Sequence, residues 1–159
     1  MTRAPFDSIV AQHGARVWRV CRALLGEHDA DDAWSETFLA ALEAYPRLAA
    51  GSNVEGWLVT IAHRKAIDVL RRSTRLRVGE VPDRPAPDAS VPGRSRDLDL
   101  ARALARLPQR QRETVVLHHL GGLPFAEVAA AVGGSADAAR RASSDGVRRL
   151  RELLGGVDA

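Results

Sequence analysis

Residues 121–151 have the sequence GGLPFAEVAAAVGGSADAARRASSDGVRRLR, and they decide the fold expected for the second half of the chain. A short apolar helix is expected from Pro124, because proline is tolerated at a first helical position. Gly133 can take the positive φ of a sharp corner, and Ser135 can cap the amides of the helix that follows. Helix, glycine turn and arginine-rich helix is the order of a helix-turn-helix.

The arginines of the last helix allow two interpretations. Residues 140–151 are dense in arginine, and such a helix in a DNA major groove would contact phosphates and guanine edges. A plain helical hairpin with a solvated basic face explains the same residues. Gly146 in mid-helix costs on the order of 1 kcal/mol relative to alanine, so we expect the helix to be weakened there.

Prolines further upstream divide the chain into two units. Residues 78–97, VGEVPDRPAPDASVPGRSRD, contain four prolines and no apolar period, which predicts a flexible linker. The second unit, 98–159, is expected to open with a helix that breaks at Pro108 and restarts. The first unit, 1–77, has the size of a small helical bundle.

Three helices are expected in the first unit. The first ends near Gly26, and the second begins at Asp29, whose side chain can cap the next turn. Pro46 ends the second helix. The third is signalled by Ser52 with Glu55 three positions later, which is a capping-box pattern.

Composition favours an all-α fold of two small helical bundles joined by the proline-rich linker. Hydrophobic residues make up 45% of the chain and aromatic residues only 4%, so the core must be built from leucine, valine and alanine. Cys21 is the single cysteine, which excludes an intrachain disulfide and fits a reducing compartment. No signal peptide or long apolar run is evident, so we expect a cytoplasmic protein without membrane insertion.

Charge is segregated along the chain, although the formal net charge is only +3. Residues 27–43 hold acidic side chains and no lysine or arginine, and this is either a solvated helix start or a protein-binding face. Asp31 and Asp32 are adjacent on a helix and point about 100° apart, so they do not converge on a metal ion. We therefore favour a protein-binding face and expect no metal site.

The segment 52–72, SNVEGWLVTIAHRKAIDVLRR, combines a buried stripe with basic side chains. Basic groups near an asparagine-containing loop and a tryptophan suit the phosphates and splayed bases of single-stranded nucleic acid. Trp57 is also well explained as a core residue. His118 and His119 lack a nearby serine or cysteine nucleophile motif, so we interpret them as ordinary helix residues and expect no catalytic site.

Taken in order, these segments resemble the extracytoplasmic-function group of the sigma-70 family, and the likeness covers almost the whole chain. Residues 29–42, DADDAWSETFLAAL, are similar to the family's DAEDLVQETFLRAW-type segment, and residues 57–72, WLVTIAHRKAIDVLRR, to its WLYRIARNLALDHLRR-type segment. The family's C-terminal pattern is matched by LARLPQRQRETVVL, GLPFAEVAAAVGGS and VRRLR within residues 104–151. Each match is weak alone, and their order makes them fairly specific.

The resemblance implies a non-enzymatic subunit that brings core RNA polymerase to promoter DNA. It implies no cofactor, an anti-sigma partner, and contacts with the clamp of the largest polymerase subunit and the flap of the second largest. The clamp-binding residues would be Asp31, Asp32, Glu36 and Thr37. The residues at the −10 element would be Ser52, Asn53, Trp57, His63, Arg64, Lys65, Arg71 and Arg72. The residues at the −35 element would be Ser135, Arg140, Arg141, Ser144 and Arg148.

The last helix departs from the family pattern and leaves alternatives open. Ala142 and Asp145 stand where arginines are usual, and Ser143 stands where a core leucine is usual. One alternative is therefore a degenerate sigma-like chain that occupies the polymerase or an anti-sigma factor without recognising a −35 element. Another is a free-standing helix-turn-helix regulator that binds duplex DNA without polymerase.

Overall fold

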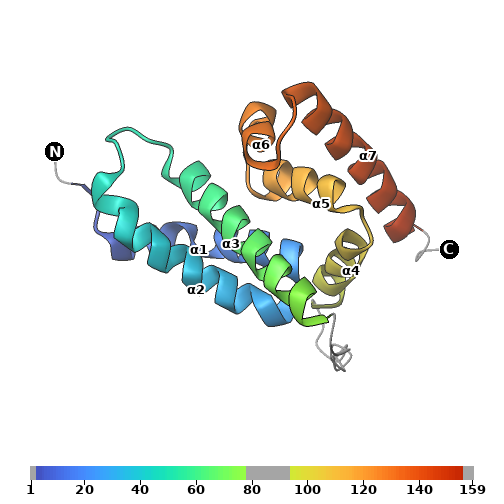
Figure 1. Cartoon of the computed structure of the whole chain (residues 1–159), viewed down its shortest axis with the longest axis horizontal. Coiled ribbons are helices and arrows are strands. Elements are labelled where there is room, and N and C mark those ends of the chain that lie inside the picture. Colours follow the sequence, from blue (N-terminus) through green and yellow to red (C-terminus); the bar gives the residue numbers. More distant parts are fainter. Residues whose placement is uncertain (1–2, 78–93, 156–159) are drawn as a thin grey trace.

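The computed structural model describes residues 3–77 and 94–155, and every regular element within them is helical (Figure 1). This confirms the predicted all-α class. The first unit contains α1 (Phe6–Leu25), α2 (Glu27–Ala44), the short 3-10 helix η1 (Tyr45–Arg47) and α3 (Val54–Arg77). The second contains α4 (Arg94–Ala105), α5 (Gln109–Val115), the π-helical η2 (Val116–Leu120), α6 (Phe125–Val132) and α7 (Ala136–Gly155).

Two helix starts differ from the sequence predictions. Helix α2 begins at Glu27 directly after Gly26, so the prediction that Asp29 caps this helix was wrong. Gly26 has a φ of 83°, a conformation that suits glycine and turns the chain without extra residues. Helix α4 begins at Arg94, so residues 94–97 of the predicted linker are helical, and residues 78–93 lie outside the described part of the chain.

The start of α3 is capped by a different residue from the one predicted. Because α3 begins at Val54, the capping position falls on Asn53, whose Oδ1 accepts the Gly56 amide at 3.2 Å. The Ser52 hydroxyl instead donates to the Ala49 carbonyl at 2.6 Å. The predicted capping box of Ser52 and Glu55 was therefore wrong by one position.

Glu55 does not cap α3, and its side chain instead contacts α1. Its carboxylate lies 3.3 Å from His13 Nδ1 and 3.1 Å from Arg16 Nη1. Both contacts are partly exposed, so each adds little stability by itself.

The centre of the first unit is small and aliphatic, as its composition predicts. Val17, Cys21, Ala33 and Ala62 are fully buried or nearly so, and alanines let α1, α2 and α3 approach closely. Burial raises the pKa of the Cys21 thiol to about 12, so this cysteine stays protonated at neutral pH. The single cysteine is a core residue.

Gly146 is a packing position of α7. The helix runs unbroken from Ala136 to Gly155, and a Cβ atom at Gly146 would lie 2.6 Å from Val115 Cγ2 and 3.3 Å from the Gln111 carbonyl. Glycine therefore lets α5 lie directly against α7. Helix propensity does not take this contact into account, so the expected weakening of the helix stays a prediction.

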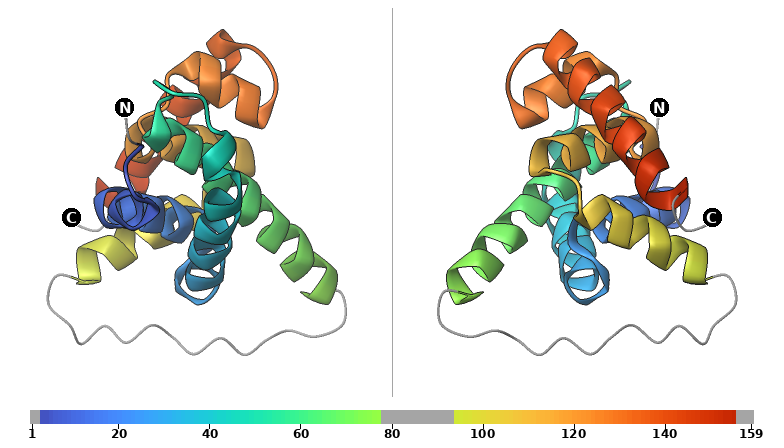
Figure 2. Two further views of the ribbon diagram at one scale, coloured as in Figure 1. Left: turned by 90° about the vertical axis from the view of Figure 1, so that its left-hand side faces the viewer. Right: turned by 90° about the vertical axis from the view of Figure 1, so that its right-hand side faces the viewer.

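The two units pack against each other, an arrangement that the sequence left open. Helix α1 contacts both α4 and η2, and Figure 2 shows α1 beside α4. One apolar cluster runs from residues of α1, such as Val20, to residues of the second unit, such as Leu104 and Leu150. A second cluster joins Val59 of α3 to residues of η2, α6 and α7. The described parts of the chain therefore share a continuous core.

Gly146→Ala tests the packing role of this glycine. We expect the free energy of unfolding to fall by about 1–3 kcal/mol, because the new methyl group overpacks the contact between α5 and α7. Helix propensity alone predicts a gain of about 1 kcal/mol. Urea unfolding followed by circular dichroism measures the sign. Gly155→Ala is the matched control, since its Cβ meets nothing within 4 Å, and stabilisation by Gly146→Ala would refute the packing role.

Candidate nucleic-acid interface

Four of the residues predicted at the −10 element line one cavity of about 350 Å³ at the start of α3. They are Asn53, Trp57, His63 and Arg64, of which Arg64 is exposed and Trp57 half-buried. The opposite wall comes from α6 and includes Glu127. An aromatic face beside amide and guanidinium groups can stack a base and hold a phosphate.

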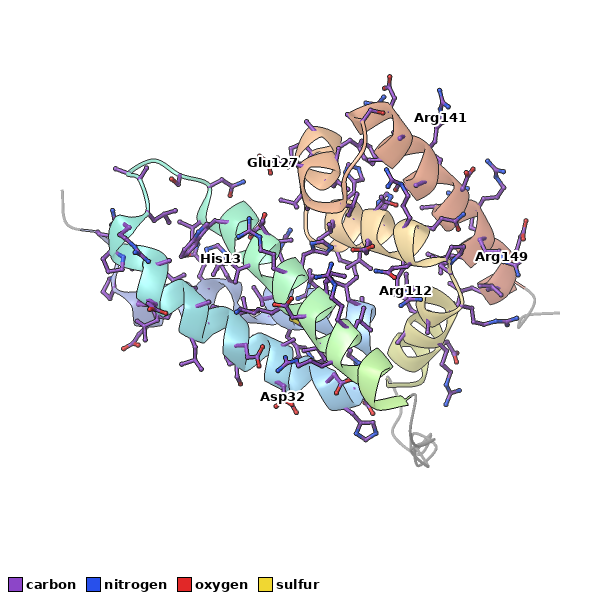
Figure 3. The ribbon with its side chains drawn as sticks, in the orientation of Figure 1. His13, Asp32, Arg112, Glu127, Arg141 and Arg149 are labelled. Carbon is purple, nitrogen blue, oxygen red and sulfur yellow. The ribbon has the colours of Figure 1, made fainter. Side chains whose placement is uncertain are left out.

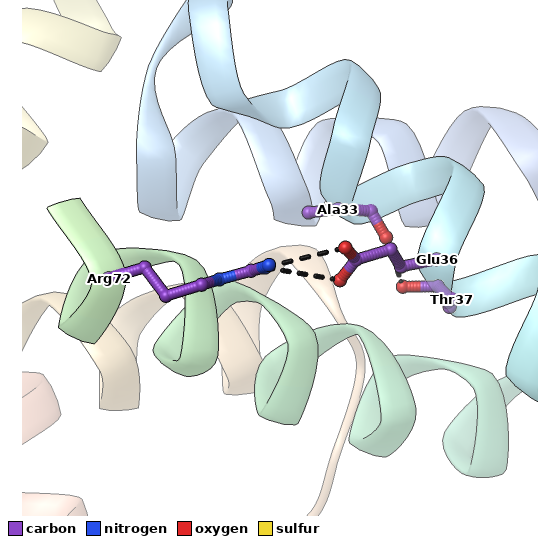
Figure 4. Close-up of polar contacts among 4 residues, drawn as sticks. All are labelled: Ala33, Glu36, Thr37 and Arg72. Atoms are coloured by element: carbon purple, nitrogen blue, oxygen red, sulfur yellow. Dashed lines mark hydrogen bonds and ion pairs between the residues drawn. The ribbon is translucent and has the colours of Figure 1, made fainter.

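The other basic residues of α3 lie outside this cavity. Arg71 and Arg72 are exposed nearer the end of the helix, and Lys65 is half-buried. The Arg72 guanidinium lies 3.4 Å from both carboxylate oxygens of Glu36 on α2 (Figure 4). Arg72, which was predicted to contact DNA, therefore pairs with Glu36, which was predicted to contact polymerase.

His63 is buried and paired, which sequence analysis did not foresee. Its Nε2 lies 2.5 Å from Glu113 Oε1 on α5, and only 6% of the His63 side chain and 12% of the Glu113 side chain are exposed. Glu113 lies 50 positions away along the chain, so no local pattern could have paired them. In this arrangement the His63 ring pairs with Glu113 at the edge of the cavity, and its contact with a nucleic-acid strand stays a prediction.

The outer side of α2 carries acidic residues together with two exposed leucines. Asp31 and Asp32 are exposed, and 66% of Leu39 and 52% of Leu42 are accessible. We call Asp31, Asp32, Leu39 and Leu42 the acidic face of α2; Figure 3 shows Asp32 on the outside of the helix. The sequence alone does not single out these two leucines as exposed, because apolar residues of a helix usually belong to its buried stripe.

Thr37 does not belong to the acidic face of α2. It is fully buried, and its hydroxyl donates to the Ala33 carbonyl at 2.6 Å (Figure 4). Glu36 is half-buried and holds Arg72. Of the four residues predicted to contact polymerase, Asp31 and Asp32 are thus the ones that lie on the open surface.

The residues predicted at the −35 element lie on the exposed side of α7. Ser135 accepts the Ala138 amide at 3.0 Å, which confirms it as the cap of the helix. Ser144 is exposed, and Figure 3 shows Arg141 pointing away from the body of the molecule. The turn before α7 contains Gly133 with a φ of 93°, the positive value that the sequence predicted.

Several arginines of α7 have carboxylate partners one turn away. Arg140 lies 2.9 Å from Asp137, and Arg148 lies 3.3 Å from Asp145. Arg140 also lies over the Phe125 ring, 5.3 Å from its centroid. These contacts orient the guanidinium groups and reduce the positive potential of the helix surface. Exposed pairs of this kind are weak, so a phosphate can replace the carboxylate.

The described ranges hold no group of three or more histidine, cysteine or acidic side chains that could bind a metal ion. Among the helices described, none is long and apolar enough to cross a membrane.

Comparison with known proteins matches both halves of the chain to known protein families. The family models "Sigma-70 region 2" and "Sigma-70, region 4" match residues 9–76 and 97–150. The RNA polymerase sigma factor CarQ of Myxococcus xanthus is 34% identical over 160 residues, covering 96% of this chain and 91% of CarQ. The ECF RNA polymerase sigma factor SigE of Mycolicibacterium smegmatis is 33% identical over 158 residues. The chain belongs to the extracytoplasmic-function group of the sigma-70 family.

Region 2 of this family member thus comprises α1 to α3, and region 4 comprises α4 to α7. The chain spans 61% of the length of SigE, and 94% of this chain is covered in that match. A solved structure, CnrH in complex with the cytosolic domain of CnrY, superposes with a TM-score of 0.67 at 27% identity, covering 95% of this chain and 88% of that one. The arrangement of helices is therefore shared with a sigma factor that was captured with a protein partner.

Asn53→Ala tests which residue caps the helix that carries the cavity. Loss of the Asn53 side chain is expected to lower the free energy of unfolding by about 1 kcal/mol, because the Gly56 amide loses its acceptor. Ser52→Ala is the matched control, and its change should stay within about 0.5 kcal/mol. Thermal or urea unfolding followed by circular dichroism measures both. If Ser52→Ala lowers the free energy of unfolding more than Asn53→Ala does, Ser52 and not Asn53 is the cap.

Proposed function

We propose that this chain is a sigma factor that binds core RNA polymerase and directs promoter recognition, melting and transcription initiation. The observation that carries the proposal is the match of region 2 and region 4, in order, over residues 9–76 and 97–150. The exposed charges support it, since α2 presents carboxylates and α7 presents arginines. A single chain with both surfaces can connect an enzyme to nucleic acid.

The acidic face of α2 is the proposed docking surface for the clamp of the largest polymerase subunit. Two exposed leucines beside Asp31 and Asp32 suit a partner with an apolar centre and a basic rim. Burial of the leucines supplies affinity, while the carboxylates steer association and set its orientation. Thr37 is excluded from the proposed contact because it is fully buried.

The cavity at the start of α3 is the proposed site for the non-template strand of the −10 element. Trp57 offers an aromatic surface to an unstacked base, Arg64 a charge for phosphate, and Asn53 an amide near the same cavity. Arg71, exposed further along α3, extends the basic track. Capture of unstacked bases offsets part of the cost of separating the DNA strands.

Helix α7 is the proposed contact with the −35 element. We propose two units, 1–77 and 98–159, joined by the segment between them. Arg140 and Arg148 must exchange their carboxylate partners for phosphates on binding. We therefore expect weak duplex binding by region 4 alone, with the polymerase, including the flap of its second largest subunit, supplying effective concentration.

Two further aspects follow from membership of the family. CnrH is bound in its solved structure by the cytosolic domain of CnrY, and we extend this to a protein partner of the anti-sigma type for the present chain. We place its action in the cytoplasm, where polymerase and DNA are found. Nucleotide addition belongs to the polymerase, so we assign no catalytic residue, cofactor or metal to this chain.

Association with core polymerase tests the role of the acidic face of α2. Asp32→Arg is expected to weaken binding by about tenfold or more, because it places a cation against a basic rim. Asp99→Arg on α4 is the matched control, since it makes the same charge change at another exposed position. Quantitative pull-down with core polymerase measures both variants. Equal binding by Asp32→Arg and the unaltered chain would remove this surface from the proposal.

Run-off transcription tests the function as a whole. Purified chain, core polymerase and a library of genomic promoters should give specific RNA that is absent with core polymerase alone. Transcripts from a restricted set of promoters are the expected result. If the chain neither associates with core polymerase nor yields run-off RNA, the proposed function is wrong.

A further inference from the structure

A stack of planar side chains connects η2, α6 and α7 within region 4. The His118 ring of η2 stacks on the Phe125 ring, with the two centroids 3.9 Å apart and an angle of 16° between the planes. The Arg140 guanidinium of α7 lies over the same Phe125 ring, 5.3 Å from its centroid. Phe125 is the first residue of α6, and Figure 1 shows α6 beside the start of α7. Side chains from three successive helices therefore meet at one aromatic ring.

A backbone hydrogen bond holds the histidine end of this stack. His118 Nδ1 lies 2.9 Å from the Leu123 carbonyl oxygen, and because a carbonyl oxygen can only accept, Nδ1 carries the proton and donates it. His118 lies in the π-helical η2, a rare conformation that is frequent at functional sites. With the His118 ring held by the backbone, the Phe125 ring that stacks on it has little freedom to turn.

Two different groups hold the Arg140 guanidinium at the other end. Asp137, three positions earlier, lies 2.9 Å from Nη1 of Arg140, and the two side chains are 79% and 59% exposed. An ion pair this exposed is weak, so a phosphate can replace the carboxylate. A phosphate cannot replace the apolar ring of Phe125. The contact between Phe125 and Arg140 is therefore the one that can persist when DNA binds.

We propose that Phe125 is a positioning residue for duplex binding, which acts by holding the Arg140 guanidinium in place for a DNA phosphate. Without the ring, Arg140 would lose its orientation when Asp137 is released, and ordering a long side chain on binding opposes affinity. With the ring, part of this ordering is already present in the free protein. The inference rests on the proposed role of α7 at the −35 element, and it adds a residue of α6 that prepares α7 for that role.

Arg148 offers a matched comparison on the same helix. It also has an aspartate partner three positions earlier, Asp145, at 3.3 Å, and its side chain is likewise exposed. Arg148 lies about two turns beyond Arg140 along α7, which places it well away from Phe125. A change at Phe125 should therefore act on duplex binding through Arg140 and not through Arg148.

The test measures how the full chain binds a fluorescent duplex of mixed sequence at low salt. Phosphate contacts supply non-specific binding of this kind, so the test needs neither polymerase nor a known promoter. Phe125→Leu and Phe125→Met keep an apolar side chain and remove the aromatic face, whereas Phe125→Tyr keeps it. Fluorescence anisotropy gives the affinity of each variant. Circular dichroism and urea unfolding show which variants are folded, and the second ringless variant serves if the first is not.

Loss of the ring is expected to weaken duplex binding by about three- to fivefold, which is the size of one exposed cation–π contact. Phe125→Tyr should differ from the unaltered chain by less than about twofold, since tyrosine offers a comparable face. The effect of Phe125→Leu should disappear in an Arg140→Ala background and persist in full in an Arg148→Ala background. A general disturbance of region 4 would weaken binding in both backgrounds alike, so the two backgrounds separate positioning from a structural role.

The possible results separate the inference from the proposed function. If the folded ringless variants bind as tightly as the unaltered chain, or lose affinity equally in both backgrounds, Phe125 does not position Arg140 and the inference is wrong. The inference is also wrong if Arg140→Ala leaves duplex binding unchanged or if the unaltered chain does not bind the duplex. Specific run-off RNA from the unaltered chain and core polymerase would still uphold the proposed function in these cases. If the ring acts through Arg140 as expected but core polymerase yields no RNA, the positioning role stands and the proposed function is wrong.

Discussion

The buried contact between His63 of α3 and Glu113 of α5 is the constraint on which the arrangement of the two units depends. An ionisable pair with so little exposure is tolerated only when its members bond each other, since an unpaired buried charge is strongly destabilising. Hydrogen bonding is directional, so the pair restricts how α5 can lie against α3. Val59 of α3 and the apolar cluster that joins α1 to α4 and η2 supply further contacts between the units.

With the two units held in this arrangement, the charged surfaces differ in how exposed they are. The acidic face of α2 remains exposed, and α7 presents its arginines outward, whereas the cavity of α3 faces region 4. The surfaces that we propose for polymerase, for the −10 strand and for the −35 duplex therefore differ in how open they are in this arrangement.

Local patterns were sufficient for the helices and for several of their ends. The glycine turn at Gly133 and the cap at Ser135 follow from short-range chemistry, and the structure confirms both. Errors arose where a neighbour far along the chain decides the outcome. Gly146 costs helix propensity but lets α5 approach α7, and the partner of His63 lies on another helix. The exposure of Leu42 likewise depends on how α2 packs.

A double-mutant cycle of His63→Ala and Glu113→Ala in the full chain measures the central contact most directly. The free energies of unfolding of the unaltered chain, both single variants and the double variant give the interaction energy between the two side chains. Our account predicts a coupling of about 1 kcal/mol or more, in the range found for residues in direct contact. Additivity within about 0.3–0.5 kcal/mol would contradict it, because it would mean that the two side chains do not hold the units together.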